Sequence, residues 1–316
     1  MPTVSILIPA YRPDYLDLCI ASALAQTHTD FELLISDDSG GEVLESIVSK
    51  WQDPRIRYVK NPNLQMPGAN RDNLLSLATG KYAKFLFDDD LLLPRSVELL
   101  LLAIERTGAK LAFHNRHIID ARGQVTASPV TVSDGGLVEL EPEMFFDQFI
   151  GQANNFIGEP TNILIDLETL RSIDNPFGIN NGRMRFLTDV ALYTNFASRN
   201  HKIAGIGYMG AAIRRHAGQY SDPSQPLFSA GLFEWELFMR WAMAQGRLKP
   251  ERYQQTIQGL HNAYQQRLND LPELEVFLRL QGKPDEGGYF GPSYREALSV
   301  AYMTLELKRI ARKTLG

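Results

Sequence analysis

Short apolar runs alternate with helix-patterned segments along the first 110 residues. The apolar runs have the length and composition of buried strands, and the segments between them carry apolar residues three and four positions apart, as helices do. The strand-like runs cover 3–8, 31–36, 56–59 and 82–87, and the helix-like segments cover 14–26, 42–50, 68–78 and 95–107. This alternation favours a parallel sheet with helices packed on both of its faces. The sequence therefore predicts an α/β fold.

The alternation ends after residue 110. Further strand-like runs occur at 110–119, 161–165 and 202–213, with an irregular stretch between the first two and a helical pattern at 187–198. The pattern is then helical at 228–245, 250–268, 271–281 and 293–314. The proline-containing segment 221–226 is the predicted boundary. We therefore expect a sheet domain over 1–224, with halves 1–110 and 111–224, and a helical region over 225–316.

Composition and charge exclude several classes of protein. The net charge of −5 argues against nucleic acid as the main partner, because phosphate contacts need clustered Lys and Arg. The one cysteine, Cys19, excludes a disulfide framework, and its apolar neighbours at helical spacing predict a buried core residue. The apolar run 97–104 is far below the roughly 20 residues of a membrane span, and no basic segment precedes the first apolar run. We expect a soluble cytoplasmic protein.

Candidate ligand-binding residues lie at the predicted carboxyl ends of three strands, where open α/β sheets bind ligands. These residues are Pro9, Ala10, Tyr11 and Arg12 after the first strand, Asp37 and Asp38 after the second, and Asp88, Asp89 and Asp90 after the fourth. Five carboxylates repel one another unless a cation joins them. Mg²⁺ and Mn²⁺ suit such a site, because they use one or two carboxylates and complete their shell with water and phosphate oxygens. The alternative is that an aspartate only caps the helix that begins near Pro94.

No glycine-rich nucleotide motif follows the first strand. The absence of G-x-G-x-x-G argues against a nicotinamide site, and the absence of G-x-x-x-x-G-K-[ST] excludes a P-loop. A bound diphosphate would therefore be neutralised by a metal and by side chains. Arg71 is a candidate, because it lies at the start of the predicted helix 68–78, where backbone amides also favour anions. A solvated surface arginine is the alternative.

Two segments carry a resemblance to a known family. The first is SILIPAYRPDYLDLCIASALAQTHTDFELLISDDSG, with P-x-Y after the strand and D-D after F-E-L-L-I-S, and the second is GANRDNLLSLATGKYAKFLFDDDLLLP. Both resemble the opening motifs of the family 2 glycosyltransferases, which have the GT-A fold. The resemblance is close over 1–110, looser to about 220, and absent over 225–316. It implies a Rossmann-like, mostly parallel sheet with a C-terminal helical extension.

The resemblance implies a role for each residue at the strand ends. Pro9, Ala10, Tyr11 and Arg12 would line the nucleoside pocket, Asp38 would accept a hydrogen bond from the base, and Arg71 would lie near the base or the diphosphate. Asp88–Asp90 stand at the family's D-x-D metal motif, although Phe87 occupies the place where that motif usually begins. Asp89 is the expected ligand of Mn²⁺ or Mg²⁺, with Asp88 toward the ribose. Asp90 and His216, the latter in RRHAGQYS, are further metal candidates.

The resemblance also implies a catalytic base. Asp189 in FLTDVALYTNFA lies at the family's distance from the metal motif, although Thr188 replaces the usual Glu. The alternative is that Asp189 merely opens a helix. Glu159 in GEPTNILI is a candidate contact of the acceptor or the sugar, and Arg214 or Arg215 of the diphosphate.

The implied activity is an inverting transfer of a sugar from a nucleotide sugar to a hydroxyl of a saccharide or lipid-linked acceptor. UDP is the expected nucleotide, with dTDP and GDP as alternatives. A catalytically inactive sugar-nucleotide-binding or scaffold protein of the same fold is the rival interpretation. A haloacid-dehalogenase-type phosphatase fits less well, because Leu92 stands where that family has Thr or Val. For the helical region we weigh a cover over the acceptor site, a homodimer contact and a peripheral contact with the inner membrane face.

Overall fold

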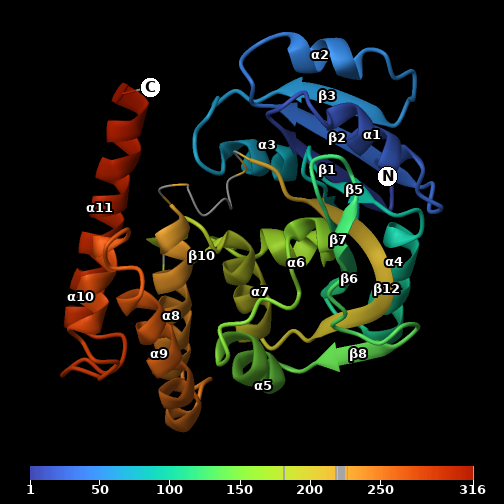
Figure 1. Ribbon diagram of the computed structural model, residues 1–316. Helices are drawn as coiled ribbons and strands as arrows, with labels where there is room; N and C mark the ends of the chain where they lie inside the picture. The colour runs from blue at the N-terminus through green and yellow to red at the C-terminus, as the bar shows by residue number, and fades with distance from the viewer. Residues whose placement is uncertain (181, 218, 220–224, 226, 316) are drawn as a thin grey trace. The chain divides into compact units, whose positions relative to one another are not determined.

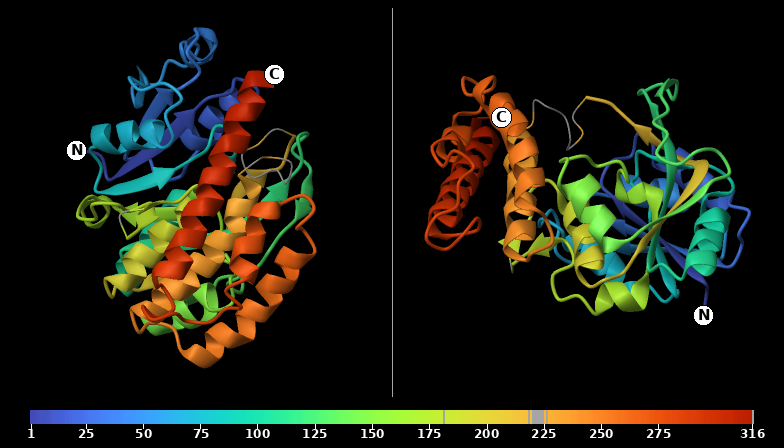
Figure 2. Two further views of the ribbon diagram at one scale, coloured as in Figure 1. Left: turned by 90° about the vertical axis from the view of Figure 1, so that its left-hand side faces the viewer. Right: turned by 90° about the horizontal axis from the view of Figure 1, so that it is seen from below.

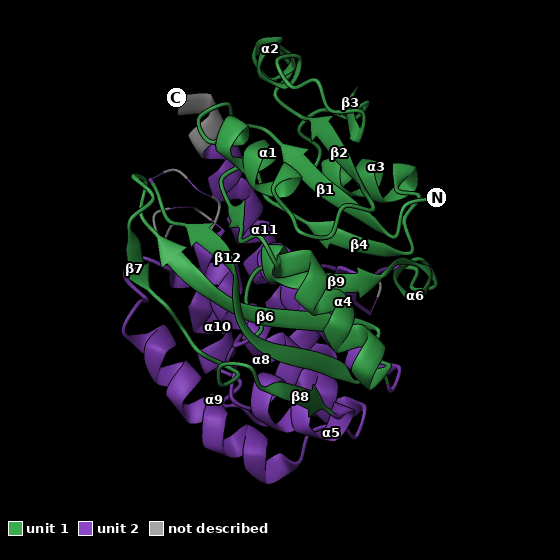
Figure 3. Cartoon of the chain, turned by 90° about the vertical axis from the view of Figure 1, so that its right-hand side faces the viewer, with its two compact units in different colours: residues 1–140, 157–174, 201–216 green, residues 141–156, 175–200, 217–316 purple. Residues whose placement is uncertain are grey.

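The computed structural model describes the chain except residues 181, 218, 220–224, 226 and 316 and the side chains of 312–315. Two compact units are distinguished in Figure 3. Unit 1 comprises 1–140, 157–174 and 201–216, and unit 2 comprises 141–156, 175–200 and 217–316. The predicted boundary segment 221–226 lies outside the described residues except at position 225, and the expected domain limits stay predictions.

Unit 1 is built on a mixed, mostly parallel sheet. Its first four strands are β1 (Val4–Ala10), β2 (Phe31–Asp37), β3 (Ile56–Lys60) and β4 (Tyr82–Phe85), parallel to one another in the order β3-β2-β1-β4. The sheet continues through β9 (Ile163–Asp166), β6 (Leu111–Ile119), β12 (Ile203–Arg214) and β5 (Leu91–Leu92). β12 runs parallel to β6, whereas β9 and β5 run antiparallel to their neighbours. The predicted α/β fold is confirmed.

Helices pack against this sheet (Figure 1), as its buried apolar residues require. The helices α1 (Leu16–Leu24), α2 (Val43–Val48) and α4 (Ser96–Thr107) share one core with alternate residues of β1, including Ile6 and Ile8. Cys19 is fully buried in this core, as predicted. The helices α3 (Ala69–Leu77) and α6 (Leu167–Arg171) contact β1, β2, β4 and β9 on the opposite face. Strand alternation supplies both faces with apolar side chains.

The structure differs from the predicted elements in three places. Leu91 and Leu92 form β5 rather than leading into a helix, because they pair with the end of β12. The stretch predicted to be irregular contains β7 (Val125–Ala127) and β8 (Leu137–Leu140), whose residues are mostly exposed and so left no apolar pattern. The predicted helix 271–281 is a 3₁₀ turn, η3 (Pro272–Leu274), followed by the short α10 (Glu275–Leu278).

Unit 2 is predominantly helical, and Figure 2 shows its long helices from two sides. Its elements are α5 (Pro142–Met144), the π-helix η1 (Phe145–Ile150), β10 (Gly178–Ile179), β11 (Gly182–Arg183), α7 (Thr188–Ser198), α8 (Phe228–Ala244), α9 (Pro250–Gln265), η3, α10 and α11 (Pro292–Leu315). Aromatic contacts join η1, α7 and α8, since the ring of Phe149 lies 6.0 Å from that of Tyr193 and 5.8 Å from that of Trp235. Among the described residues, no helix combines the length and apolar character needed to cross a bilayer.

Candidate active site

Three parallel strands of unit 1 end at one edge of the sheet. Ala10 of β1 is in register with Asp37 of β2, and Leu7 of β1 with Phe85 of β4. The amide of Asp38 donates to the carbonyl of Ala10 at 2.8 Å, which ties the first two loops together. The register therefore brings the loops with Tyr11, Asp38 and the three consecutive aspartates to the same edge.

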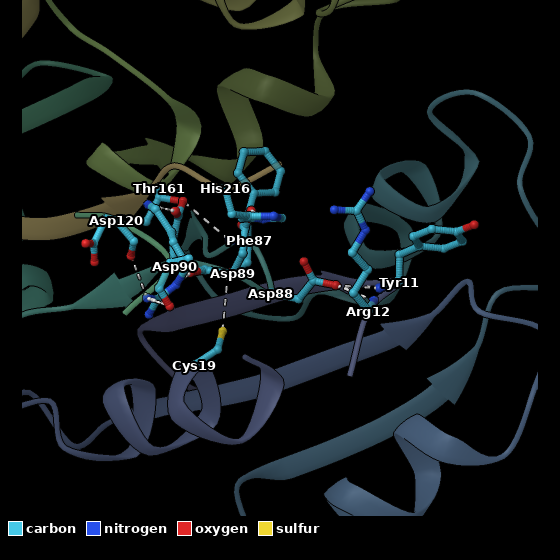
Figure 4. A network of polar contacts seen from close by, with 12 residues as sticks. Tyr11, Arg12, Cys19, Phe87, Asp88, Asp89, Asp90, Asp120, Thr161 and His216 are labelled. Atoms are coloured by element: carbon cyan, nitrogen blue, oxygen red, sulfur yellow. Dashed lines mark hydrogen bonds and ion pairs between the residues drawn. The ribbon is translucent and has the colours of Figure 1, made fainter. Parts of the chain in front are cut away.

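Asp88 fastens the third loop to the first. Its Oδ2 accepts hydrogen bonds from the amides of Tyr11 at 2.6 Å and Arg12 at 2.8 Å (Figure 4). Burial raises the pKa of Asp88 to about 6, against the two amide hydrogen bonds, which lower it. The ring of Tyr11 stays 48% exposed, and Pro9 and Ala10 lie directly before it, half-buried and buried. Asp88 thus holds the backbone that presents Tyr11 and Arg12.

Asp89 pairs with His216 just beyond the end of β12. Its Oδ2 lies 3.1 Å from Nε2 of His216, and both side chains keep some solvent exposure. The backbone carbonyl of Asp89 accepts a hydrogen bond from Nε of Arg214 at 2.9 Å. Arg214 also donates to the carbonyl of Asp120 at 3.1 Å, and its guanidinium lies 4.1 Å from the ring of Tyr15. The buried Arg214 therefore fixes the loop rather than facing a ligand.

Asp90 is buried and engaged on both oxygens. Thr161 donates to Oδ2 at 2.6 Å, and the amide of Arg214 donates to Oδ1 at 3.0 Å. Burial and the nearby carboxylate of Asp89 raise the pKa of Asp90 well above its ordinary value. These contacts use both carboxylate oxygens of Asp90 to hold the loop in place, whereas the side chain of Asp89 keeps some solvent exposure.

A buried lysine supports the same loop from beneath. Lys84 on β4 has no solvent exposure and donates to the backbone carbonyl of Thr161. The Thr161 hydroxyl also accepts a hydrogen bond from the amide of Phe87 at 3.3 Å. Burial lowers the pKa of Lys84 well below its ordinary value, although the Asp90 charge opposes that shift. Neither residue was predicted from the sequence, because nothing in their local pattern marks a partner almost 80 positions away.

The second strand contributes Asp37 and Asp38, which have different surroundings. Asp37 is buried and accepts hydrogen bonds from the Tyr58 hydroxyl at 2.5 Å and the Ser39 amide at 2.7 Å. Asp38 is half-buried, and its Oδ1 accepts from the Asn61 side chain at 2.7 Å and the Gln65 amide at 2.8 Å. Asp37 therefore stabilises the strand end, and Asp38 is the carboxylate with access to solvent.

Arg71 lies in the first turn of α3, in unit 1. Gly68, which precedes this helix, has a φ of 80°, a conformation that glycine adopts without strain. The neighbouring Asn70 donates to the carbonyl of Ser36 at 3.0 Å, which attaches the start of α3 to β2. The Arg71 guanidinium makes an ion pair of 3.3 Å with Asp72 and keeps 23% exposure. The turn thus carries a partly exposed cation, as the sequence analysis expected.

Glu159 binds two arginines in unit 1. Its carboxylate lies 3.0 Å from Nε of Arg116 and 2.5 Å from an Nη of Arg215. The side chain of Arg215 is 43% exposed, whereas Arg214 is buried. Of Arg214 and Arg215, only Arg215 therefore reaches solvent.

Of the three consecutive aspartates, Asp89 is the one whose side chain fits a divalent cation, because Asp88 and Asp90 bind backbone amides. The described residues contain no group of three His, Cys, Asp or Glu side chains arranged to hold a metal. Mg²⁺ and Mn²⁺ need only one or two protein ligands when a substrate diphosphate supplies the rest, and Asp89 with His216 offers one carboxylate and one imidazole. The helix-cap alternative fails, since α4 begins at Ser96 with no side-chain cap.

Asp189 belongs to unit 2 and lies in the first turn of α7. Its Oδ2 accepts a hydrogen bond from the side-chain amide of Asn155 at 2.8 Å. Asn155 follows η1, whose aromatic residues are buried. Asp189 therefore lies in the first turn of α7 with its carboxylate oriented by a side chain from a distant segment.

Glu234 on α8 holds the backbone that leads into α7. Its buried carboxylate accepts hydrogen bonds from the amides of Arg185 at 2.6 Å, Phe186 at 3.1 Å and Leu187 at 2.6 Å, and from the Tyr302 hydroxyl at 2.8 Å. Burial raises the pKa of Glu234 above its ordinary value, against these donors. A carboxylate at a helix N-terminus also interacts favourably with the helix dipole. The sequence analysis missed Glu234, because its helical spacing resembles that of any amphipathic helix.

Comparison with known proteins gives a family match over this part of the chain. A model described as glycosyl transferase family 2 matches residues 5–173, more than half of the chain. The matched range contains all of β1 except Val4, the three consecutive aspartates and Glu159, but not Asp189 or His216.

Similar proteins include two bacterial glucosyltransferases. The GalNAc(5)-diNAcBac-PP-undecaprenol beta-1,3-glucosyltransferase of Campylobacter jejuni is 36% identical over 105 residues, which cover 32% of this chain and 34% of that protein. The UDP-Glc:alpha-D-GlcNAc-diphosphoundecaprenol beta-1,3-glucosyltransferase WfaP of Escherichia coli is 25% identical over 222 residues, covering 70% of this chain and 80% of that protein. The chain thus spans about a third of the Campylobacter relative.

A solved structure supports the fold. Residues 1–349 of TarS from S. aureus, in complex with UDP-GlcNAc, match with a TM-score of 0.61 over 88% of this chain and 77% of that one. The two sequences are 15% identical. This likeness shows a shared GT-A-type fold.

Proposed function

The chain belongs to glycosyltransferase family 2, and we propose that it transfers a sugar from a UDP-sugar to a hydroxyl of a lipid-linked saccharide, with inversion at the anomeric carbon. The observation that carries this proposal is the convergence of four strand ends of unit 1 on one sheet edge. There the exposed ring of Tyr11, the half-buried Asp38 and the Asp89–His216 pair follow β1, β2, β4 and β12. Family membership and this convergence support a nucleotide-sugar site.

For the donor, we assign the nucleoside to the first two loops. Asp38 would accept a hydrogen bond from the base, and the segment Pro9–Arg12, held by Asp88, would line the pocket. Arg71 and Arg215 are the partly exposed cations of unit 1 that would meet the diphosphate. The UDP-GlcNAc in the TarS complex supports uridine as the nucleoside, with dTDP and GDP as alternatives.

For the metal, we assign Asp89 and His216 as the protein ligands of Mn²⁺ or Mg²⁺. A bound divalent cation would stabilise the negative charge that builds up on the leaving diphosphate. Asp90 was expected to be a further ligand, but both of its oxygens accept hydrogen bonds from Thr161 and Arg214. We therefore propose that Asp90 and Asp88 hold the loop that presents Asp89.

For the base, we assign Asp189. An alcohol is far less acidic than an aspartic acid, so Asp189 would take the proton only as the new C–O bond forms, when the hydroxyl has become acidic. A base positioned in this way contributes about 10²–10⁴-fold to the rate. Asn155 and Glu234 would fix its position through the side chain and the backbone before α7.

For the acceptor, the two similar glucosyltransferases are named for undecaprenol-linked substrates. Their names support a lipid-linked saccharide and a peripheral position at the inner membrane face. A homodimer through the helical region is a separate prediction, which sedimentation of the purified chain would decide.

A binding panel tests the proposal. The purified chain is heated with UDP, dTDP, GDP or CDP and their common sugars, each with Mn²⁺, Mg²⁺ or EDTA. We expect a metal-dependent rise in unfolding temperature with one UDP-sugar, followed by turnover of that donor with undecaprenyl-diphosphate saccharides. Binding without turnover of any acceptor would favour the inactive sugar-nucleotide-binding protein, and no response to any nucleotide would contradict the donor site.

A further inference from the structure

The last helix of unit 2 carries an exposed apolar stripe. Val300, Met303, Leu307 and Ile310 of α11 are 38%, 60%, 62% and 52% exposed. Their spacing of three, four and three residues places them on one face of the helix. Scattered exposed apolar residues are ordinary on protein surfaces, but a continuous stripe marks an interaction surface.

The stripe is distinct from the face with which α11 packs into unit 2. Tyr294, Ala297, Ala301 and Leu305 on the opposite side of the helix are buried. That side contacts α10 and η3, which closes the core of the helical unit (Figure 2). The apolar stripe is therefore not needed to hold α11 in place.

Positive charge follows the stripe toward the end of α11. Lys308 and Arg309 are partly exposed and pair with Glu273 at 2.6 Å and Glu306 at 2.5 Å, and the sequence continues with Arg312 and Lys313. Residues 307–316 contain four Lys or Arg and no Asp or Glu, so this stretch keeps a net positive charge beyond these two ion pairs. Apolar side chains beside cations are the combination that binds anionic lipid headgroups.

The extent of the stripe argues against a second copy of the chain as its occupant. Four side chains, none more than 62% exposed, offer far less than the roughly 800 Å² that each partner contributes to a stable interface. A coiled-coil seam would need three or four heptads, and the stripe covers 300–310. Membrane adsorption has no such minimum, because electrostatic attraction adds to a small apolar contact.

We propose that α11 lies on an anionic membrane surface and inserts Val300, Met303, Leu307 and Ile310 among the lipid headgroups. The inference deepens the proposed function, since an enzyme that uses a lipid-linked acceptor works at such a surface. It rests on the exposed face and the charge of α11, and its test needs no catalytic turnover.

The full chain is sedimented with two kinds of vesicle, in low and in high salt. One kind is phosphatidylcholine alone, and the other contains about 30% phosphatidylglycerol, because an anionic surface attracts basic segments. We expect binding to the anionic vesicles that weakens with salt. The double variant M303S/L307S should bind them at least about tenfold more weakly. The matched control V125S/V130S replaces two apolar residues of unit 1 with similar exposure, 57% and 62%, and should bind like the wild type. Circular dichroism and thermal unfolding verify that both variants fold.

Several results would overturn the inference. They are an absence of vesicle binding by the wild type, equal binding by M303S/L307S, and a dimer in sedimentation that this variant loses. The proposed function is tested separately with a water-soluble acceptor analogue, toward which M303S/L307S should keep wild-type turnover. Vesicle binding without any sugar transfer would support the membrane-binding surface and contradict the proposed catalytic function.

Discussion

Unit 1 and unit 2 hold their candidate functional aspartates by different means. In unit 1, Asp88 and Asp90 flank Asp89 and bind backbone amides of neighbouring segments, so the acidic loop stabilises itself. In unit 2, no aspartate flanks Asp189 in the sequence; Asn155 donates to its carboxylate, and Glu234 from α8 holds the backbone before it. The loop of the proposed cation ligand thus uses its own carboxylates as anchors. The proposed base at the start of α7 depends instead on a carboxylate from a distant helix.

The largest expected effect separates chemistry from binding. Asp189→Asn should lower kcat by about 10²–10⁴-fold, because an amide cannot accept the acceptor proton. UDP-sugar affinity should stay within about twofold, measured by calorimetry, since a base acts on the acceptor rather than on the donor. Turnover like that of the wild type would reject Asp189 as the base.

The opposite pattern is expected in unit 1. Asp89→Ala should weaken Mn²⁺-dependent UDP-sugar binding by at least about 100-fold, because even indirect partners of a metal ligand contribute 10–100-fold. Binding in EDTA should barely change. Asp134→Ala, at an exposed loop position of the same unit, is the control and should bind normally. Metal-dependent binding that survives in Asp89→Ala would remove this residue from the metal site.

Glu234→Gln probes the remote support of unit 2. It keeps the shape of the side chain but removes the charge that attracts three backbone amides. We expect kcat to fall about tenfold through displacement of Asp189, with KM for the donor unchanged. The loss of stability should be about 1 kcal/mol, since weaker hydrogen bonds are partly offset by relief of a buried charge. Glu251→Gln on the exposed side of α9 should change neither quantity. An unchanged kcat would show that α7 keeps its position without this carboxylate.

The smallest expected effect is a pH dependence of stability. Burial raises the pKa of Glu234, so the folded chain binds this proton more tightly than the unfolded chain does. Stability from this group is complete below its unfolded pKa near 4.5 and falls as the pH rises through its higher folded pKa. Urea unfolding should therefore show that the free energy of unfolding of the wild type exceeds that of Glu234→Gln by more at pH 4.5 than at pH 7. An equal difference in free energy of unfolding at the two pH values would contradict a raised pKa of Glu234 in the folded chain.

The two units also differ in how much of their structure could be predicted from the sequence. The alternation over 1–110 predicted β1 to β4, because β1, β2 and β4 are largely buried and each loop is short, and the aspartates follow a strand directly; β3 is only partly buried. The support of those aspartates by Lys84 and Thr161, and of Asp189 by Glu234, depends on pairs separated by 47 to 77 positions. A single sequence gives no sign of such pairs. The exposed strands β7 and β8 were missed for a related reason, since their pairing is set by β6 and β12 rather than by their own pattern.

Arg214 makes the acidic loop part of the cooperative core. Arg214 is the last residue of β12. Its amide donates a hydrogen bond to Asp90, and its guanidinium donates to the carbonyls of Asp89 and Asp120. These contacts must break before the loop can open, so its local opening should cost more free energy than that of a loop without them. In amide hydrogen exchange, the Arg214 amide should therefore be protected more strongly than the amides of the exposed loops of unit 1. The acidic loop then exchanges as part of the sheet that it follows rather than as a surface loop.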